Sequence, residues 1–531
     1  MAPRNSVGKA RRSIARAESL FLMMFAVVAI CSGFAGAQTA TPQTGDSTTG
    51  QSASESLKKL DLLVEHNSQL EKQNRELMDQ IESLRRVLAK QAGVEVESIT
   101  KQTELATGSK TAPDLQQGEE PTATAKLTSS EKPPDMWGSY TPNLGYKVAN
   151  TDRGDVSISI YSYARYLNQL GLDSTYKDAF GNVKNVQQRQ DFQLNKVQIK
   201  FLGWMFDPKF RYFMYAWSSN ASQGLGAQVV LAGNLNYAFN KYISVGAGIR
   251  SLPGTRSVEG NFPFWLGVDT RLIADEFFRP SYTSGVWAWG KLGHRLDYIA
   301  MIGNNLSTLG VSAAQLNNGF NTVSTSLVWT PSTGEFGQGF GDFEDHQKLA
   351  TRLAGHFTRS TEDRQEQPNS DQFENTQIRL EDGSVIFTPN LFGPGISIND
   401  VTYKMAAFDG GVKYHGFSLE GEYFLRWLDH FHGPGTAGLA SIFSHGFQLQ
   451  ASAMVLPKTL QVYLGGSTLS GKYGNPWDFR GGLNYFPFHN KVIRWNNEFL
   501  YLYHSPVGYT SVPFALGGTG PVFATTLELA F

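Results

Sequence analysis

The last eleven residues of the chain, PVFATTLELAF at 521–531, alternate between two kinds of side chain. Phe523, Leu527 and Phe531 belong to an apolar row, whereas Thr526 and Glu528 belong to a row that is small or polar. Because successive side chains of a strand point to opposite faces, a strand here has one apolar and one polar face. A soluble protein rarely leaves such an edge strand at its terminus. The pattern is typical of a strand that faces lipid on one side and a water-filled interior on the other.

Alternating runs of this kind follow one another through the region 137–531. There are sixteen: 155–167, 189–204, 210–219, 228–239, 242–251, 285–291, 295–303, 322–330, 347–359, 404–414, 417–429, 442–454, 459–469, 477–486, 492–503 and 521–531. Very short turns join some runs, and long polar loops join others, at 171–188, 304–321, 361–402 and 430–443. An even number of strands can close and so remove its edges. The sequence therefore predicts an all-β fold, a sixteen-stranded antiparallel transmembrane β-barrel.

Two details refine this prediction. Aromatic side chains gather near the ends of the runs, for example Trp204, Trp329 and Trp477, as interfacial girdles require. The alternative for these aromatics is the core of a soluble barrel. The run at 189–204 changes its parity midway, which predicts a β-bulge.

The N-terminus has the pattern of a secretory signal peptide, residues 1–37. Basic residues precede an apolar stretch at 20–30, and Ala35-Gly36-Ala37 offers a cleavage site. Twin-arginine export through Arg11-Arg12 and a lipoprotein at Cys31 are the weaker alternatives. Cleavage would remove the chain's one cysteine, which leaves no thiol for a disulfide. From residue 40 onward no apolar run approaches the ~20 residues that a membrane-spanning helix needs.

A heptad pattern occupies residues 57–92, between polar linkers at 38–56 and 93–136. Its core positions are Leu60, Leu63, Asn67, Leu70, Asn74, Leu77, Ile81, Leu84 and Leu88. Apolar residues held at these positions through about four heptads predict an α-helical coiled coil. The two core asparagines favour two strands over three, and a single amphipathic helix docked on another surface is the alternative. Ahead of an outer-membrane barrel, this coil would lie in the periplasm.

One segment, residues 253–280, is too long for a turn and does not alternate. We expect it to fold into the barrel and narrow the passage, where its charges would act on any ion that enters. The candidate residues for constriction and ion selectivity are Arg250, Arg256, Arg271, Arg279, Lys291 and Arg295. Glu259, Asp269, Asp275 and Glu276 interleave with them, so the sign of the selectivity stays open. The alternative for each arginine is an ordinary solvated or salt-bridged side chain.

Four stretches, at 195–219, 240–260, 274–292 and 410–427, resemble the phosphate-selective porin O and P family in pattern and in order. The resemblance covers roughly residues 150–531. It implies a sixteen-stranded porin, usually a homotrimer, that passes phosphate or other anions through a passage lined by arginine and lysine. The family's arginine ladder and lysine cluster cannot be matched here position by position. The terminal strand with its last aromatic residue, Phe531, also resembles the assembly signal that the barrel assembly machinery recognises.

Motifs for other chemistry are missing from the sequence. It contains no P-loop, no dinucleotide-binding fingerprint and no zinc protease motif, so we predict no enzyme, no catalytic residue and no cofactor. His430 and His432 could offer imidazoles to a metal, but solvated side chains in a long loop are the better interpretation. A net charge of −1 gives no indication of a nucleic-acid partner.

Together these patterns predict an outer-membrane porin for passive diffusion of small hydrophilic solutes, with anions such as phosphate as the leading hypothesis. One alternative is a barrel that mainly anchors the coil, which would tether the outer membrane to the cell wall or to a partner. Another alternative is a sugar-specific porin, in which lumenal tyrosine and tryptophan side chains stack on the solute.

Overall fold

The structure is a computed structural model that describes residues 140–141, 145–218, 229–259, 262–309, 311, 315–316, 319–366, 378–509 and 511–531. The chain divides into two compact units, residues 1–113 and 114–531, and every described residue belongs to the second. The predicted signal peptide, coiled coil and linkers lie outside the described residues and stay predictions.

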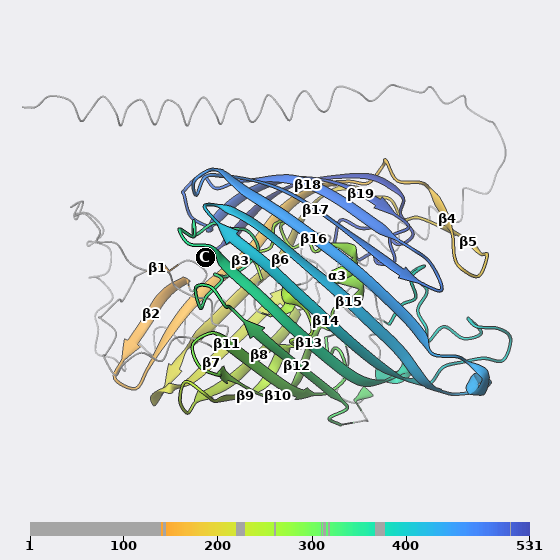
Figure 1. Cartoon of the computed structure of the whole chain (residues 1–531), viewed down its shortest axis with the longest axis horizontal. Helices are drawn as coiled ribbons and strands as arrows, with labels where there is room; N and C mark the ends of the chain where they lie inside the picture. Colours follow the sequence, from red (N-terminus) through yellow and green to blue (C-terminus); the bar gives the residue numbers. More distant parts are fainter. Residues whose placement is uncertain are drawn as a thin grey trace, which may run out of the picture. The chain divides into compact units, whose positions relative to one another are not determined.

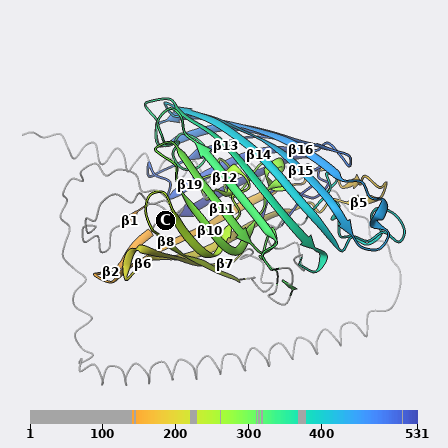
Figure 2. The same cartoon turned by 60° about the horizontal axis from the view of Figure 1, so that its bottom comes forward.

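Within the described residues, sixteen strands close into one antiparallel barrel (Figures 1 and 2). They are β3 (Gly154–Asn168), β6 (Gln190–Met205), β7 (Asp207–Ser218), β8 (Val229–Ala238), β9 (Ser244–Ser251), β10 (Tyr282–Lys291), β11 (Leu296–Gly303), β12 (Thr322–Trp329), β13 (Ala350–Asp363), β14 (Asp400–Tyr414), β15 (Phe417–His432), β16 (Ile442–Leu456), β17 (Leu460–Gly471), β18 (Trp477–Tyr485), β19 (Ile493–Tyr503) and β20 (Gly520–Ala530). Each strand pairs with the next along the chain, and β20 pairs with β3 to complete the ring. Each of the sixteen predicted runs overlaps one of these strands.

Two short strands lie beside the closure. β1 (Tyr140–Thr141) pairs with β2 (Gly145–Thr151), and β2 pairs with the first residues of β3, just beyond the end of β20. The Phe531 backbone continues the seam, since its N–H donates to the Ile160 carbonyl at 2.9 Å. The Phe531 ring packs edge-on against Tyr146, with 5.6 Å between the ring centroids. The last aromatic residue therefore takes part in closing the barrel.

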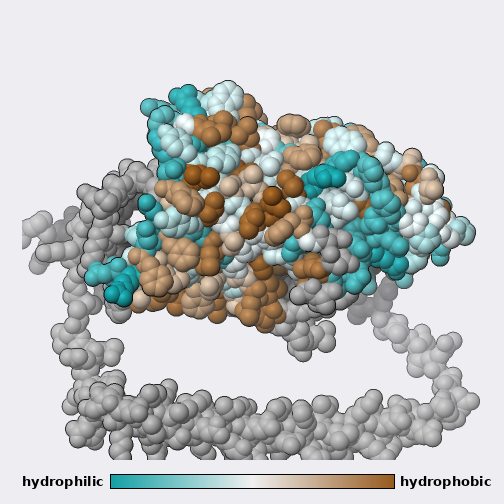
Figure 3. All heavy atoms as spheres, turned by 90° about the horizontal axis from the view of Figure 1, so that it is seen from below, coloured by the Kyte–Doolittle hydropathy of each residue, from teal (hydrophilic) through white to brown (hydrophobic). Residues whose placement is uncertain are grey.

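The two faces of the wall differ as the alternation predicts. In β20, Phe523 and Leu527 are 42% and 52% exposed on the outside, whereas Thr526 and Glu528 are buried inside. On the face that Figure 3 shows, apolar side chains gather over the middle of the wall, and hydrophilic residues lie toward both ends. Burying this outer surface in hydrocarbon removes its contact with water and stabilises the barrel in a bilayer.

The predicted bulge is present in β6. The pairing steps from Tyr161 opposite Gln198 to Tyr163 opposite Asn195, so β6 carries one extra residue. Lys196, with φ of 48°, occupies the irregular position, and Asn195 and Lys196 both point inward. The bulge thus moves the apolar row of β6 back to the outside after the parity change.

The two ends of the barrel are unequal. One end, here the short-turn end, carries the brief connections at 239–243, 292–295, 415–416 and 457–459 together with the C-terminus. The other, the long-loop end, carries β4 (Thr175–Lys177), β5 (Val183–Asn185), η3 (Arg364–Glu366) and η4 (Thr436–Gly438) in its loops. Residues 330–349 break this rule, because they form a long connection between β12 and β13 at the short-turn end. The sequence had placed the start of a strand at residue 347, whereas β13 begins at Ala350.

The connection between β9 and β10 turns into the barrel, as predicted. It contains η1 (Arg256–Val258) and the short helix α3 (Ile273–Phe278), and both are buried. α3 contacts the inner faces of β15, β16, β17 and β18, and it appears within the ring of strands in Figure 1. None of the helices in the described part of the chain is long and apolar enough to cross a bilayer.

Candidate functional site

The candidate site is the interior around the β9–β10 connection, residues 252–281, called here the inward loop. Its irregular backbone leaves carbonyl groups without ladder partners, and buried carbonyls need donors. The barrel wall supplies several of them. Arg494 Nη1 donates to the Trp265 carbonyl at 2.6 Å, and Arg480 Nη1 donates to the Thr270 carbonyl at 3.0 Å. Basic side chains of the wall therefore hold the loop in the interior.

Glu276 on α3 brings two predicted selectivity residues together. Its carboxylate lies 3.1 Å from Arg271 Nη1 and accepts from Arg279 Nε at 3.1 Å. The Arg271 guanidinium also stacks on Trp265, 3.8 Å from the ring centroid. All three charged side chains are nine-tenths or more buried. The pairing fits the salt-bridged alternative and makes these arginines structural as well as charged.

Arg256 sits deeper, at the junction of the inward loop with the wall. Its Nε lies 3.1 Å from the Glu420 carboxylate, and its backbone N–H donates to Glu422 at 2.9 Å. Nη2 donates to the carbonyl of Gly339, also at 2.9 Å. Gly339 belongs to the long connection at the short-turn end, so Arg256 links the inward loop to that segment.

The other predicted selectivity residues lie elsewhere. Arg250 is half-buried on β9, and its guanidinium faces Trp287 at 5.7 Å from the ring centroid. Lys291, whose side chain is 41% exposed, pairs with Asp297 at 3.1 Å across β10 and β11. Arg295 is exposed in the turn between these strands. The structure thus gathers Arg256, Arg271 and Arg279 in the inward loop and leaves Lys291 and Arg295 at the short-turn rim.

The β6 bulge contributes a residue that the sequence did not single out. Lys196 Nζ lies 2.5 Å from Asp269 of the inward loop, and Tyr163 on β3 donates to the same carboxylate at 2.8 Å. All three side chains are buried. The extra residue of the bulge therefore aims a cation at the inward loop.

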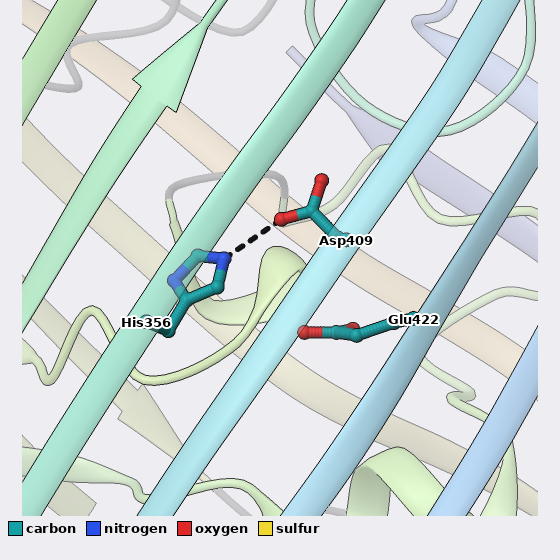
Figure 4. A group of neighbouring side chains, drawn as sticks. All are labelled: His356, Asp409 and Glu422. Atoms are coloured by element: carbon teal, nitrogen blue, oxygen red, sulfur yellow. Dashed lines mark hydrogen bonds and ion pairs between the residues drawn. The ribbon is translucent and has the colours of Figure 1, made fainter.

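His356, Asp409 and Glu422 converge from β13, β14 and β15, and Figure 4 shows them facing one another. Three potential ligands in one place raise the question of a metal ion. Both imidazole nitrogens are already engaged, Nδ1 with the Pro253 carbonyl at 3.0 Å and Nε2 with Asp409 at 2.7 Å. Because a carbonyl and a carboxylate only accept, this arrangement requires a proton on both nitrogens and makes His356 a cation.

The neighbours of this trio argue against a metal as well. Arg352 Nε donates to Asp409 at 2.7 Å, and Arg352 also pairs with Glu259 of the inward loop at 2.5 Å. Glu422 already accepts from the Arg256 backbone and from Gln448. Two cations lie beside His356, Asp409 and Glu422, and the potential ligand atoms of these residues already have partners. The three residues therefore belong to a network of hydrogen bonds and ion pairs that binds the inward loop to the wall.

Two buried arginines lie toward the long-loop end, and Nη2 of each donates to a backbone carbonyl, that of Ser511 for Arg165 and that of Arg379 for Arg426. Arg165 Nε and Nη1, and Arg426 Nε, have no hydrogen-bond acceptor among the described residues, although both side chains are buried. The Arg426 guanidinium packs 4.1 Å from the centroid of Phe277 on α3. A cavity of about 10 Å³, room for about one water molecule, lies beside it. Glu276, Arg279, Arg379, Tyr403 and Arg426 are among the residues that line it.

The sequence held one signal for these wall residues. Glu420, Glu422 and Arg426 share one parity of β15 while Leu419, Tyr423 and Leu425 occupy the other. Charges confined to one face of an otherwise apolar-faced strand mark the lumenal row. That row identifies which face is inside, but it does not identify the partner of each charge.

The geometry defines the class of protein. In the described part of the chain, an antiparallel wall closes on itself, presents apolar side chains outward and encloses a charged interior that a long loop enters. A membrane-spanning outer-membrane barrel of porin type has this construction.

Comparisons with known proteins find solved structures of low similarity. No protein-family model matches the chain, and no curated protein matches it in sequence. Among solved structures, OmpT of Vibrio cholerae in its trimer form is 11% identical, with 72% of this chain and 100% of that chain covered and a TM-score of 0.45. An anion-selective porin from Comamonas acidovorans is 10% identical, with 71% and 100% covered and a TM-score of 0.42. The channel DcaP of Acinetobacter baumannii is 8% identical, with 72% and 99% covered and a TM-score of 0.42. Because these TM-scores are below 0.5, the assignment to the porin type rests on the geometry of this barrel alone.

Proposed function

We propose that the protein is an outer-membrane porin through which small hydrophilic solutes diffuse, and that it prefers small anions such as phosphate. The observation that carries the proposal is the set of lumenal guanidinium N–H groups on Arg165 and Arg426 that have no acceptor among the described residues. Charged donors bind anionic oxygens more strongly than neutral donors do. The resemblance to the phosphate-selective porin O and P family points the same way.

The preference for anions depends on the balance between positive and negative charges in the lumen. Glu420 Oε1 and Asp478 Oδ2 also lack a partner among the described residues, so the lumenal field has both signs. Opposed charges across a passage admit polar solutes in general, and an excess of one sign selects ions. The reversal potential under a salt gradient measures that excess directly.

Strand length supports a trimer, and the short turns support an orientation with the short-turn end in the periplasm. β9, β11 and β12 have 8 residues each, whereas β13, β14, β15 and β16 have 14 to 16. At ~3.3 Å per residue and a tilt near 45°, a strand of eight residues rises only ~19 Å, less than the ~25 Å apolar band of such barrels. Another copy packed against this low wall would shield it from lipid. In this orientation the predicted coil at 57–92 would extend into the periplasm.

Single-channel recording in planar bilayers under a salt gradient tests the proposal. We expect current steps in threes, a reversal potential that favours anions, and block by phosphate. Arg426→Gln should shift the reversal potential toward cations, whereas Arg295→Gln, at the exposed rim, should leave it unchanged. A large current without selectivity would keep the porin and reject the anion preference. A silent bilayer with folded protein would reject the channel and favour the anchor.

A further inference from the structure

The long connection at the short-turn end, residues 330–349, does not lie outside the barrel like its neighbours. The Phe340 N–H donates to the carbonyl of Phe264 in the inward loop at 2.9 Å. Gly339 has φ of 75°, and a Cβ there would lie 2.5 Å from the Phe264 Cβ. Only glycine permits so close an approach with that backbone conformation. We call residues 330–349 the plug segment.

The Gly339 carbonyl occupies the place where two lumenal cations meet. Arg256 Nη2 and Lys413 Nζ both donate to this oxygen at 2.9 Å, and both side chains are buried. Phe336 of the same segment lies beside both, 5.7 Å from the Arg256 guanidinium and 4.7 Å from the Lys413 ammonium. The plug segment therefore covers two positive charges with a neutral oxygen and an aromatic ring.

Contacts with the short turns hold the segment in place. Buried Asp342 accepts from the Gly416 N–H in the β14–β15 turn at 2.9 Å, and it also hydrogen-bonds the His346 ring. Glu344 pairs with Lys491 in the β18–β19 connection at 2.6 Å. The charges around His346 are Asp342 and Glu335 in its own segment, with Glu335 3.1 Å from its Nε2. The neighbouring β14–β15 turn adds the backbone N–H of His415, which donates to the His346 carbonyl at 2.9 Å.

From these contacts we propose that the plug segment is a gate at the short-turn mouth of the lumen, and that an anionic solute at Arg256 and Lys413 displaces it. The inference rests on the proposed channel function. An anion with full negative charge makes stronger hydrogen bonds to the two cations than a neutral carbonyl does. Such an anion and the Gly339 carbonyl cannot hold the same two donors at once, so binding of the anion favours the displaced segment. Closure then needs the Asp342 hydrogen bonds to return.

A cysteine beneath the plug segment reports its opening without any current. Ser452 is 3% exposed, and a Cβ at Gly341 would lie 3.1 Å from its Oγ. In a chain with Cys31→Ser, we expect Ser452→Cys to react slowly with a charged thiol reagent. Adding Asp342→Asn removes one carboxylate oxygen and with it one or two hydrogen bonds that hold the plug segment. The labelling rate of Ser452→Cys should then rise about tenfold. The matched control is Lys348→Gln, at an exposed position of the same segment, which should leave the rate unchanged.

Phosphate should also raise the labelling rate of Ser452→Cys more than chloride does at equal ionic strength, because its several oxygens can accept from both cations at once. Equal effects of both salts would overturn displacement by the anion. If Asp342→Asn fails to fold, Gly339→Ala gives a second test, because its added methyl group collides with Phe264. Unchanged labelling in a folded Gly339→Ala variant would overturn the gate.

A reversible lock separates the gate from the channel itself. Cysteines at Glu344 and Lys491, whose charged ends lie 2.6 Å apart, can be joined by a short bis-maleimide with a reducible centre. We expect the current to fall on cross-linking and to return on reduction. If the protein conducts and the cross-link does not change its current, the gate is overturned while the porin proposal stands. If no variant conducts, including Asp342→Asn, the channel proposal fails, while labelling of Ser452→Cys still decides whether the plug segment opens.

Discussion

Replacing Glu276 by glutamine is the sharpest test of how the inward loop is held. The carboxylate of Glu276 pairs with both Arg271 and Arg279, and all three side chains are buried. Glutamine keeps the shape and one acceptor oxygen but loses the charge. The two guanidinium groups would then remain in the interior with less compensation, although Asp275 lies next to Glu276 in α3.

The expected cost follows from the two ion pairs. Each contact is worth about 5 kcal/mol at a separation near 3 Å and an effective dielectric constant near 20. The glutamine oxygen retains about 1 kcal/mol through a hydrogen bond. Removing one partner from a buried ion pair typically costs about 3–5 kcal/mol. We expect the substitution to lower the free energy of local opening of the inward loop, because the hydrogen bonds between the wall strands do not depend on Glu276.

Hydrogen exchange of residues 273–281 measures this opening. A loss of about 3 kcal/mol or more should raise the exchange rate of these amides at least about 100-fold, at 1.4 kcal/mol for each factor of ten. Asp297→Asn is the control, because it breaks the Lys291 pair, whose side chains are 41% and 33% exposed. Such a surface pair is worth about 1 kcal/mol or less. The ion pairs do not hold the loop if the amide exchange rates of Glu276→Gln lie within about fivefold of those of the control. At 1.4 kcal/mol for each factor of ten, fivefold corresponds to about 1 kcal/mol.

Three further predictions concern the plug segment, the bulge and the terminus. Hydrogen bonds from the His346 ring to the Asp342 and Glu335 carboxylates raise the pKa of His346 to about 9. The stability that this residue gives the plug segment is therefore present below its ordinary pKa of 6.5 and is lost as pH rises through about 9. Current should therefore increase between about pH 7 and 10, and His346→Gln should flatten that rise. Lys196→Met removes the cation paired with the Asp269 carboxylate and should loosen the inward loop by about 3 kcal/mol, seen as faster exchange at 262–272. Lys209→Met, at an exposed position near the start of β7, should not change this exchange. Deleting Phe531 should lower the yield of folded barrel in the membrane, measured by heat-modifiable migration on a gel.

The wall of the barrel could be predicted because its signal is local. Each strand shows an alternation of apolar and polar side chains with a period of two residues, and contact with lipid on the outside requires that alternation. The bulge was visible for the same reason, since an extra residue at Asn195 and Lys196 flips the parity of everything after it. The even count and the unequal connections then defined a closed antiparallel ring.

The site could not be predicted in the same way, because its contacts join distant parts of the chain. Arg256 pairs with Glu420, which is 164 positions away, and Lys413 donates to Gly339, which is 74 positions away. Such pairs depend on the register of strands and on where the inward loop crosses the lumen. Lys291 and Arg295 are near the inward loop in sequence, but β10 carries them to the opposite end of the barrel.

The plug segment was missed for a different reason. Its phenylalanines at 336, 340 and 343 are interspersed with glycine and polar residues, which resembles a weak strand, and the polar residues at 345–348 merge into the start of β13. Periodicity alone cannot distinguish a connection that folds inward from a frayed strand. The glycines were the better signal, because Gly334, Gly337, Gly339 and Gly341 all adopt positive φ. A run of such glycines excludes a regular strand and permits a backbone that packs closely against its surroundings.

Lumenal charges in this barrel have two roles, and the second limits how the first can be tested. Arg480 and Arg494 contribute to the field along the passage, yet each also donates to a backbone carbonyl of the inward loop. Removing either side chain changes the field and at the same time leaves a buried carbonyl without its donor. A shift in selectivity after such a substitution therefore has two possible causes. Arg165 and Arg426 have the same two roles, because Arg165 Nη2 donates to the Ser511 carbonyl at 2.8 Å and Arg426 Nη2 donates to the Arg379 carbonyl at 2.9 Å. Charge substitutions whose hydrogen exchange in the inward loop matches that of the parent protein isolate the electrostatic effect.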